Sequence, residues 1–125
     1  MPKFETDRAK LDHLPLYDVP FMLGASKRTS WKDRVLMQAQ ATAEVLSDQG
    51  LTKHSLVERF NASPESFKVL IGELTDPGVA FARKHYQRWL ANSDRWEGEV
   101  TLSKFKNALE AQCAKFRATI ENQTD

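Results

Sequence analysis

Apolar residues recur at helical spacing in three stretches of the chain, and the first covers residues 31–49. Five residues fall on one side at spacings of four, four, three and four, the period of an amphipathic helix: Trp31, Val35, Ala39, Thr42 and Leu46. Ser30 is a suitable N-cap, and Gly50 can adopt the left-handed conformation that ends many helices. Leu51 would then contact Leu46. The pattern predicts a helix over residues 31–49.

A second helix is predicted from its opening sequence, Thr75-Asp76-Pro77-Gly78. An acidic cap at Asp76 precedes a proline whose φ angle already suits a first helical turn. The apolar side that follows consists of Val79, Ala82, Tyr86 and Trp89 or Leu90. We expect this helix to end near Asn92.

The last helix has the most regular pattern. Its apolar positions are spaced three, four, four, three and four residues apart: Leu102, Phe105, Leu109, Cys113, Phe116 and Ile120. Thr101 is placed to cap the N-terminus, and Val100 and Phe105 are placed to form a hydrophobic staple. The pattern predicts a helix that begins directly after Thr101.

The stretch between the first two helices, residues 51–74, supports two interpretations. Phe67, Val69 and Ile71 alternate with other residues, which favours a short strand or one arm of a β-hairpin. The sequence Ser63-Pro64-Glu65 is also a good helix opening, and a short apolar run cannot be assigned by its period alone. Both alternatives stay open at this point.

The N-terminal residues 1–28 contain Pro15 and Pro20, which are expected to break regular structure. They also carry the most apolar patch of the chain: Leu14, Leu16, Tyr17, Val19, Phe21, Met22 and Leu23. We therefore expect an irregular N-terminal arm that packs on the helices. The predicted fold is mainly α: a compact single-domain bundle over residues 1–125 with three helices, and as an option a short β-hairpin between the first and second.

Composition narrows the class of protein. The chain has 125 residues and a formal charge of +1, so no overall field attracts nucleic acid or membrane. No apolar run reaches the ~18 residues of a membrane span, and the first residues do not resemble a signal peptide. The single cysteine, Cys113, has no internal partner for a disulfide and suits a reducing compartment. We expect a cytoplasmic protein.

If the middle stretch is helical, residues 56–70 resemble a helix-turn-helix. Leu56 and Phe60 would lie on a first helix, and Asn61 would take the turn position usually held by glycine. Ser66 and Lys68 would face outward to contact nucleic acid. The alternative is a core-forming segment without any role in binding DNA.

A basic face on the second helix gives the nucleic-acid interpretation some support. Arg83, Lys84 and Arg88 lie near one another, and Arg95 follows. The aromatic residues between them, Tyr86, Trp89 and Trp96, could stack on bases while the cations contact phosphates. Alternatively, the aromatic side chains point into the core and the cations form a solvated face.

The remaining candidates for chemistry are an anion site, a metal site and a nucleophilic cysteine. Ser26, Lys27, Arg28 and Ser30 precede or open a helix, where exposed amides and cations could bind an anion. His13, His54 and His85 have no second histidine or cysteine at ligand spacing, so we predict no metal site and no cofactor. Cys113 lies on an apolar helix side and reads as a buried hydrophobe rather than a nucleophile.

These observations favour a small non-catalytic binding protein that acts through a protein partner, for example as a toxin-neutralising protein or an adaptor. The candidate contacts are Tyr17, Phe21, Arg95 and Trp96, because aromatic residues and arginine concentrate binding energy at interfaces. The alternative is a nucleic-acid-binding regulator that uses residues 56–71 and the basic face 83–95. The sequence predicts no oligomeric state.

Overall fold

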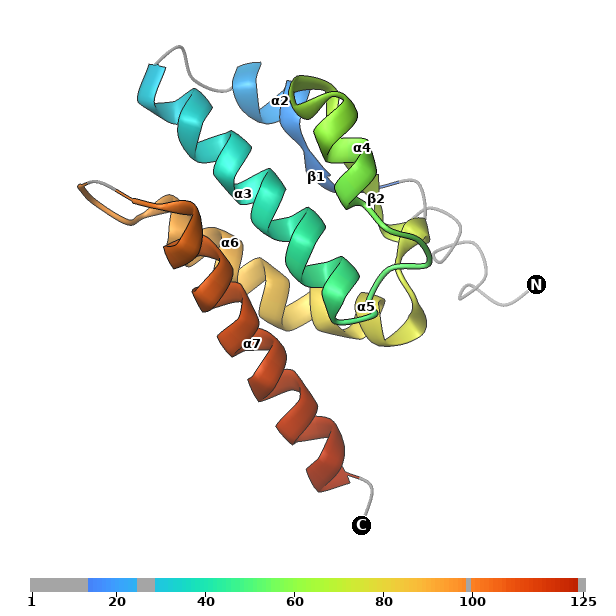
Figure 1. The fold of residues 1–125 in the computed structure, drawn as a ribbon. Helices are drawn as coiled ribbons and strands as arrows, with labels where there is room; N and C mark the ends of the chain where they lie inside the picture. The colour runs from blue at the N-terminus through green and yellow to red at the C-terminus, as the bar shows by residue number, and fades with distance from the viewer. Residues whose placement is uncertain (1–13, 25–28, 99, 124–125) are drawn as a thin grey trace.

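Helix α3 (Thr29–Asp48) is the central element of the fold, and α7 (Leu102–Gln123) packs along it (Figure 1). The structure, a computed structural model, describes residues 14–24, 29–98 and 100–123. Beside these two helices lie a bent rod formed by α5 (Asp76–Phe81) and α6 (Gln87–Asp94), and a small sheet with its flanking short helices. The predicted mainly α fold is confirmed.

Helix α3 ends as its sequence predicts. Gly50 has a φ angle of 70°, the left-handed conformation that favours glycine. The amide of Gly50 donates to the carbonyl of Ser47 at 3.2 Å, and that of Leu51 donates to Leu46 at 3.0 Å, which closes a Schellman motif. At the other end the helix already begins at Thr29, so Ser30 lies in its first turn and the predicted Ser30 cap is wrong.

The second predicted helix is present, with a different cap and an internal irregularity. The Thr75 hydroxyl, rather than Asp76, accepts the amide of Gly78 at 3.2 Å, because Thr75 still has an extended backbone. A five-residue π-helix, η3 (Ala82–Tyr86), joins α5 to α6. The rod ends at Asp94 rather than near Asn92.

The sheet corrects two predictions. Strand β2 (Lys68–Leu70) pairs antiparallel with β1 (Pro15–Asp18), so the predicted strand exists but its partner is the N-terminal segment and the proposed hairpin is wrong. Residues 15–24 are likewise regular rather than irregular, because β1 continues into α2 (Val19–Gly24). Pro15 begins a strand and Pro20 lies in the first turn of a helix, positions where a missing amide hydrogen costs little.

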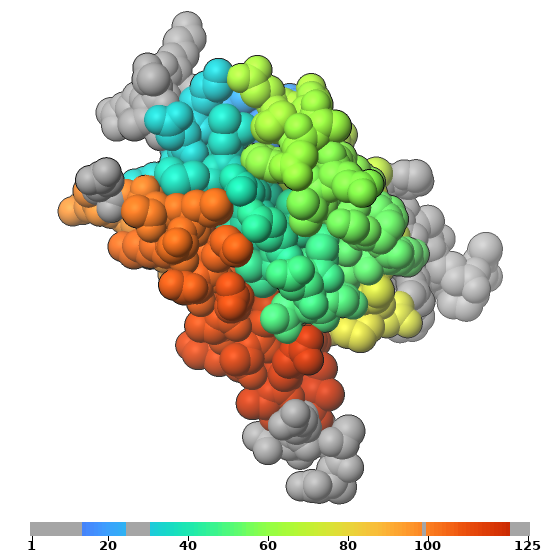
Figure 2. All heavy atoms as spheres, viewed as in Figure 1, coloured from blue at the N-terminus to red at the C-terminus, as the bar shows by residue number. Residues whose placement is uncertain are grey.

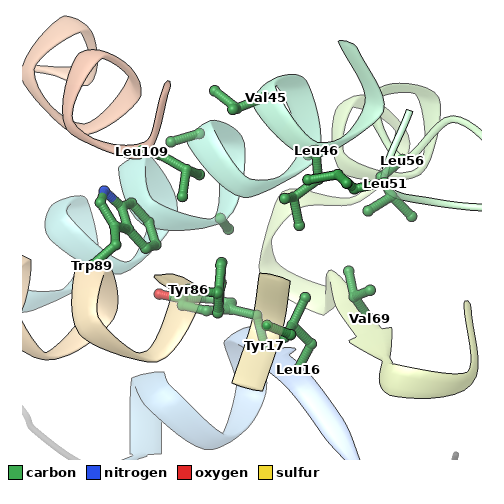
Figure 3. Packing of buried hydrophobic residues seen from close by; sticks show 14 of the residues in the cluster. Leu16, Tyr17, Val45, Leu46, Leu51, Leu56, Val69, Tyr86, Trp89 and Leu109 are labelled. Carbon is green, nitrogen blue, oxygen red and sulfur yellow. The ribbon is translucent and has the colours of Figure 1, made fainter. Parts of the chain in front are cut away.

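Strand β2 and three short helical elements connect α3 to the rod: α4 (Val57–Ala62) and two 3-10 turns, η1 (Pro64–Ser66) and η2 (Ile71–Glu73). The apolar sides of the helices and of the two strands meet in one buried cluster (Figure 3), to which η1 and η2 contribute no buried residue. Tyr17 from β1 and Tyr86 from the rod lie close together in this view, and Leu109 of α7 approaches Trp89. The last helix begins as predicted, with the Thr101 hydroxyl accepting the amide of Lys104 at 3.2 Å.

Candidate partner-binding site

The four predicted partner contacts differ in how far they are exposed to solvent. Phe21 on α2 is 73% exposed, and Arg95 is exposed as well. Trp96 is half-buried, because its ring packs on Phe105 with 5.0 Å between centroids. Tyr17 is buried at 3% exposure and faces α3 from the inner side of β1, so its prediction as a surface contact is wrong.

The helix-turn-helix predicted over residues 56–71 is not formed. Its first helix corresponds to α4, but Ser66 ends a 3-10 turn and Lys68 lies in strand β2. Val69, which a recognition helix would turn outward, is fully buried and pairs with Tyr17 of β1. Lys68 faces outward, where its ammonium nitrogen lies 3.8 Å from a carboxylate oxygen of Asp18.

The basic face exists, but two of its three aromatic residues, Tyr86 and Trp89, are buried, and only Trp96 is partly exposed. Arg83, Lys84 and Arg88 are exposed. Tyr86 is fully buried and Trp89 is 2% exposed, and the Trp89 indole donates to the carbonyl of Phe105 at 3.1 Å. These rings therefore belong to the core and offer no stacking platform.

The predicted anion site cannot be located. Ser26, Lys27 and Arg28 lie outside the described residues, and so does the side chain of Ser30. The weak anion-binding prediction therefore stays a prediction.

The two side chains considered for catalysis, His85 and Cys113, are buried among other side chains of the core. Nδ1 of His85 lies 3.2 Å from the Gln112 side-chain oxygen, and the imidazole ring stacks on Phe81 with 5.8 Å between centroids. Cys113 is 2% exposed, and burial raises the pKa of its thiol to about 11 although the charge of Arg117 acts in the opposite direction. Within the described part of the chain, no group of histidine, cysteine and acidic side chains could hold a metal ion.

A polar cluster ties α4 to β2 and η2. The guanidinium of Arg59 donates to both carboxylate oxygens of Glu73 and to the carbonyl of Lys68. Burial alone would raise the pKa of Glu73, but hydrogen bonds from Arg59, the Leu70 amide and His54 outweigh it and lower the pKa to about 2. These hydrogen bonds hold α4 against β2 and η2, which is a structural role.

A pocket of about 350 Å³ lies where the end of α3, the start of α5 and the second half of α7 meet. We name it the α7 pocket, and its lining consists of Gln49, Gly50, Leu51, Pro77, Cys113, Phe116, Arg117 and Ile120. Most of these side chains are apolar, and Arg117 is the only charged one. One of its nitrogens donates to the carbonyl of Gln49 at 3.1 Å, which leaves other guanidinium donors for a ligand.

Sequence reasoning missed the α7 pocket. The available signal was the length of the apolar side on the last helix, which continues to Ile120. The apolar side of the first helix already ends at Leu46. Ile120 is accordingly 39% exposed at the end of that side. The last turns of α7 extend past the ends of α3 and α5 (Figure 1) and form one end of the molecule in Figure 2.

The chain matches no protein-family model, no curated protein and no solved structure. No helix in the described part is long and apolar enough to cross a membrane.

Proposed function

We propose that this chain is a small, non-catalytic, cytoplasmic binding protein that acts through a protein partner and receives it at the α7 pocket. The observation that carries the proposal is the pocket itself, an apolar concavity next to a helix end that extends past the bundle. A buried free thiol at Cys113 is consistent with a reducing compartment. Roles such as neutralising a toxin or acting as an adaptor fit a binding site of this kind.

The occupant proposed for the pocket is an amphipathic helix that carries a carboxylate. Phe116 and Ile120 are one helical turn apart on α7, so the apolar wall they form runs along that helix. Recognition of a helix in an apolar groove uses apolar residues at the same three- and four-residue spacing on the partner. Arg117 at the edge of the pocket supplies the complementary charge for an acidic residue on the partner.

Residues outside the pocket have a secondary place in this proposal. Phe21 remains a candidate contact because of its 73% exposure, and Arg95 and Trp96 remain candidates at the end of α6. Nothing requires these residues to meet the same partner as the pocket. The nucleic-acid alternative has lost its recognition helix, and only the exposed cations still favour it.

A comparison of two variants tests the proposal. Affinity-tagged chain is used to capture proteins from an extract of its native host, and each retained protein is quantified. Ile120→Glu places a carboxylate in the apolar pocket and should reduce retention of the partner by at least about tenfold. Ala118→Glu adds the same group on the opposite side of α7, where residue 118 is exposed, and should leave retention unchanged.

Both variants must first show the circular dichroism spectrum and melting temperature of the unsubstituted chain. A protein retained equally by all three chains does not use the pocket. That result would contradict the proposal, as would the absence of any specifically retained protein.

A further inference from the structure

We propose that the outer face of the α5–α6 rod is a second binding surface, which recognises an acidic segment of a protein. It is formed by Arg83, Lys84, Arg88 and Arg95, which we call the basic strip. This inference goes beyond the α7 pocket and does not depend on it. It rests on how charges are paired across the described part of the chain.

Cations elsewhere on the described surface mostly have partners. Lys32 lies 2.7 Å from a carboxylate oxygen of Glu65, and Lys106 lies 3.1 Å from one of Glu44. Within the described residues, no side chain of the basic strip makes a hydrogen bond, an ion pair or a ring contact. Only Lys53 and Lys115 among the other described cations share this property.

Acidic residues are missing from the same segment of the sequence. No aspartate or glutamate occurs at positions 77–93. Asp94 follows, but its carboxylate already accepts a hydrogen bond of 2.7 Å from the side-chain amide of Gln38. The charges of Arg83, Lys84 and Arg88 are therefore uncompensated within their own segment, whereas Arg95 lies between Asp94 and Glu97 in the sequence.

The backbone beneath the strip is held firmly. His85, Tyr86 and Trp89 lie on the inner side of the same rod and are buried at 6%, 0% and 2% exposure. Because the inner side is packed, the backbone positions that carry the outer cations keep a fixed spacing. Lys84 and Arg88 are one helical turn apart, which matches carboxylates at positions i and i+4 of an acidic helix. From residue 83 to its end at Asp94 the rod is about 16 Å long, which matches about three turns of such a helix.

Acidic protein fits this strip better than nucleic acid does. Single strands bind largely by stacking on exposed aromatic rings, and both Tyr86 and Trp89 are buried. Trp96 is partly exposed, but its ring already contacts Phe105 and the ammonium group of Lys104. Duplex DNA is held by many phosphate contacts, commonly about 6–10, and the strip offers few cations on a surface that is otherwise mixed in charge. A short acidic segment needs only a few such contacts.

The test uses poly-L-glutamate and a short DNA duplex of random sequence as fluorescent probes, with binding measured by anisotropy over a range of salt concentrations. Arg83→Gln with Lys84→Gln removes two cations of the strip. The matched control, Lys53→Gln with Lys115→Gln, removes two other exposed and unpaired cations. Both double variants have the same net charge.

We expect poly-L-glutamate to bind more tightly than the duplex, and its binding to weaken as salt shortens the range of the interaction. The strip variant should lose about tenfold in affinity and the control should lose much less. Ile120→Glu should bind poly-L-glutamate nearly as well as the unsubstituted chain, which separates this surface from the α7 pocket. Tighter binding of the duplex with the same dependence on Arg83 and Lys84 would overturn the proposal in favour of nucleic acid. No binding of either probe, or equal losses in the two double variants, would overturn it altogether.

Discussion

The hydroxyl of Tyr17 lies 2.7 Å from the side-chain oxygen of Gln38, deep between strand β1 and helix α3. The amide nitrogen of Gln38 in turn donates to Ser93 at 3.0 Å and to Asp94 at 2.7 Å. Burial, with smaller contributions from Tyr86 and Asp94, raises the pKa of Tyr17 far above its usual value, so the hydroxyl keeps its proton. One polar network thus connects the N-terminal segment, the central helix and the end of α6.

Removing the Tyr17 hydroxyl should destabilise the fold. Tyr17→Phe leaves the oxygen of Gln38 buried without this donor, and we expect the free energy of unfolding to fall by about 1–3 kcal/mol. Urea denaturation measures the change. Phe21→Ser is the contrasting variant, because a side chain that is 73% exposed should contribute no more than about 0.5 kcal/mol. Equally small losses in the two variants would mean that the buried hydrogen bonds of the Tyr17 hydroxyl do not stabilise the fold.

The Glu73 cluster predicts a specific loss of stability in acid. The pKa of Glu73 is lowered from 4.5 to about 2 in the folded chain, so its carboxylate favours the folded state above pH 4.5. That contribution disappears as the pH falls from about 4.5 to about 2. Glu73→Gln removes the titrating group. The stability difference between the two chains, measured by urea denaturation at several pH values, should therefore shrink over this range, and a constant difference would contradict the assignment.

Gly78 is required by a close approach between the start of α5 and the end of α3. A Cβ atom at this position would overlap the backbone carbonyl of Leu51, which cannot move as a side chain could. We expect Gly78→Ala to cost about 1–3 kcal/mol or more, seen as a lower melting temperature. Gly24→Ala is the control, because a Cβ there meets nothing within 4 Å, and it should leave stability unchanged or slightly higher.

Cys113 should be unreactive in the folded chain. Because burial raises its pKa to about 11, the thiolate fraction is small at neutral pH. Iodoacetamide should therefore modify the native chain at least roughly a hundredfold more slowly than the chain in denaturant. Mass spectrometry follows the modification. Rapid alkylation of the native chain would indicate an accessible, activated thiol and would reopen a nucleophilic role.

The helices could be predicted from the sequence because their signals are local. The apolar period, the Thr101 cap and the Gly50 ending each depend on a few neighbouring residues, and all three are confirmed. The cap of the second helix was displaced by one residue, from Asp76 to Thr75, since both side chains can accept a hydrogen bond. Local patterns do not distinguish between such neighbours.

The pairing of β1 with β2 could not be predicted in the same way. Its two strands are separated by the whole of α3 and α4, and no local signal records which distant segment will supply a partner. The prolines at 15 and 20 were read as breaks, although each occupies the start of an element. Tyr17 is predicted as a surface contact because it is aromatic, and no local signal shows that the strand containing it is buried. The α7 pocket is also a product of long-range packing, because its walls come from three elements.

Hydrogen–deuterium exchange of the chain, alone and with its captured partner, tests the central claim most directly. Recognition at the α7 pocket predicts slower amide exchange in residues 113–120 and 49–51 when the partner is bound, with little change in helix α4. Protection confined to other segments, or no protection at all, would contradict the account.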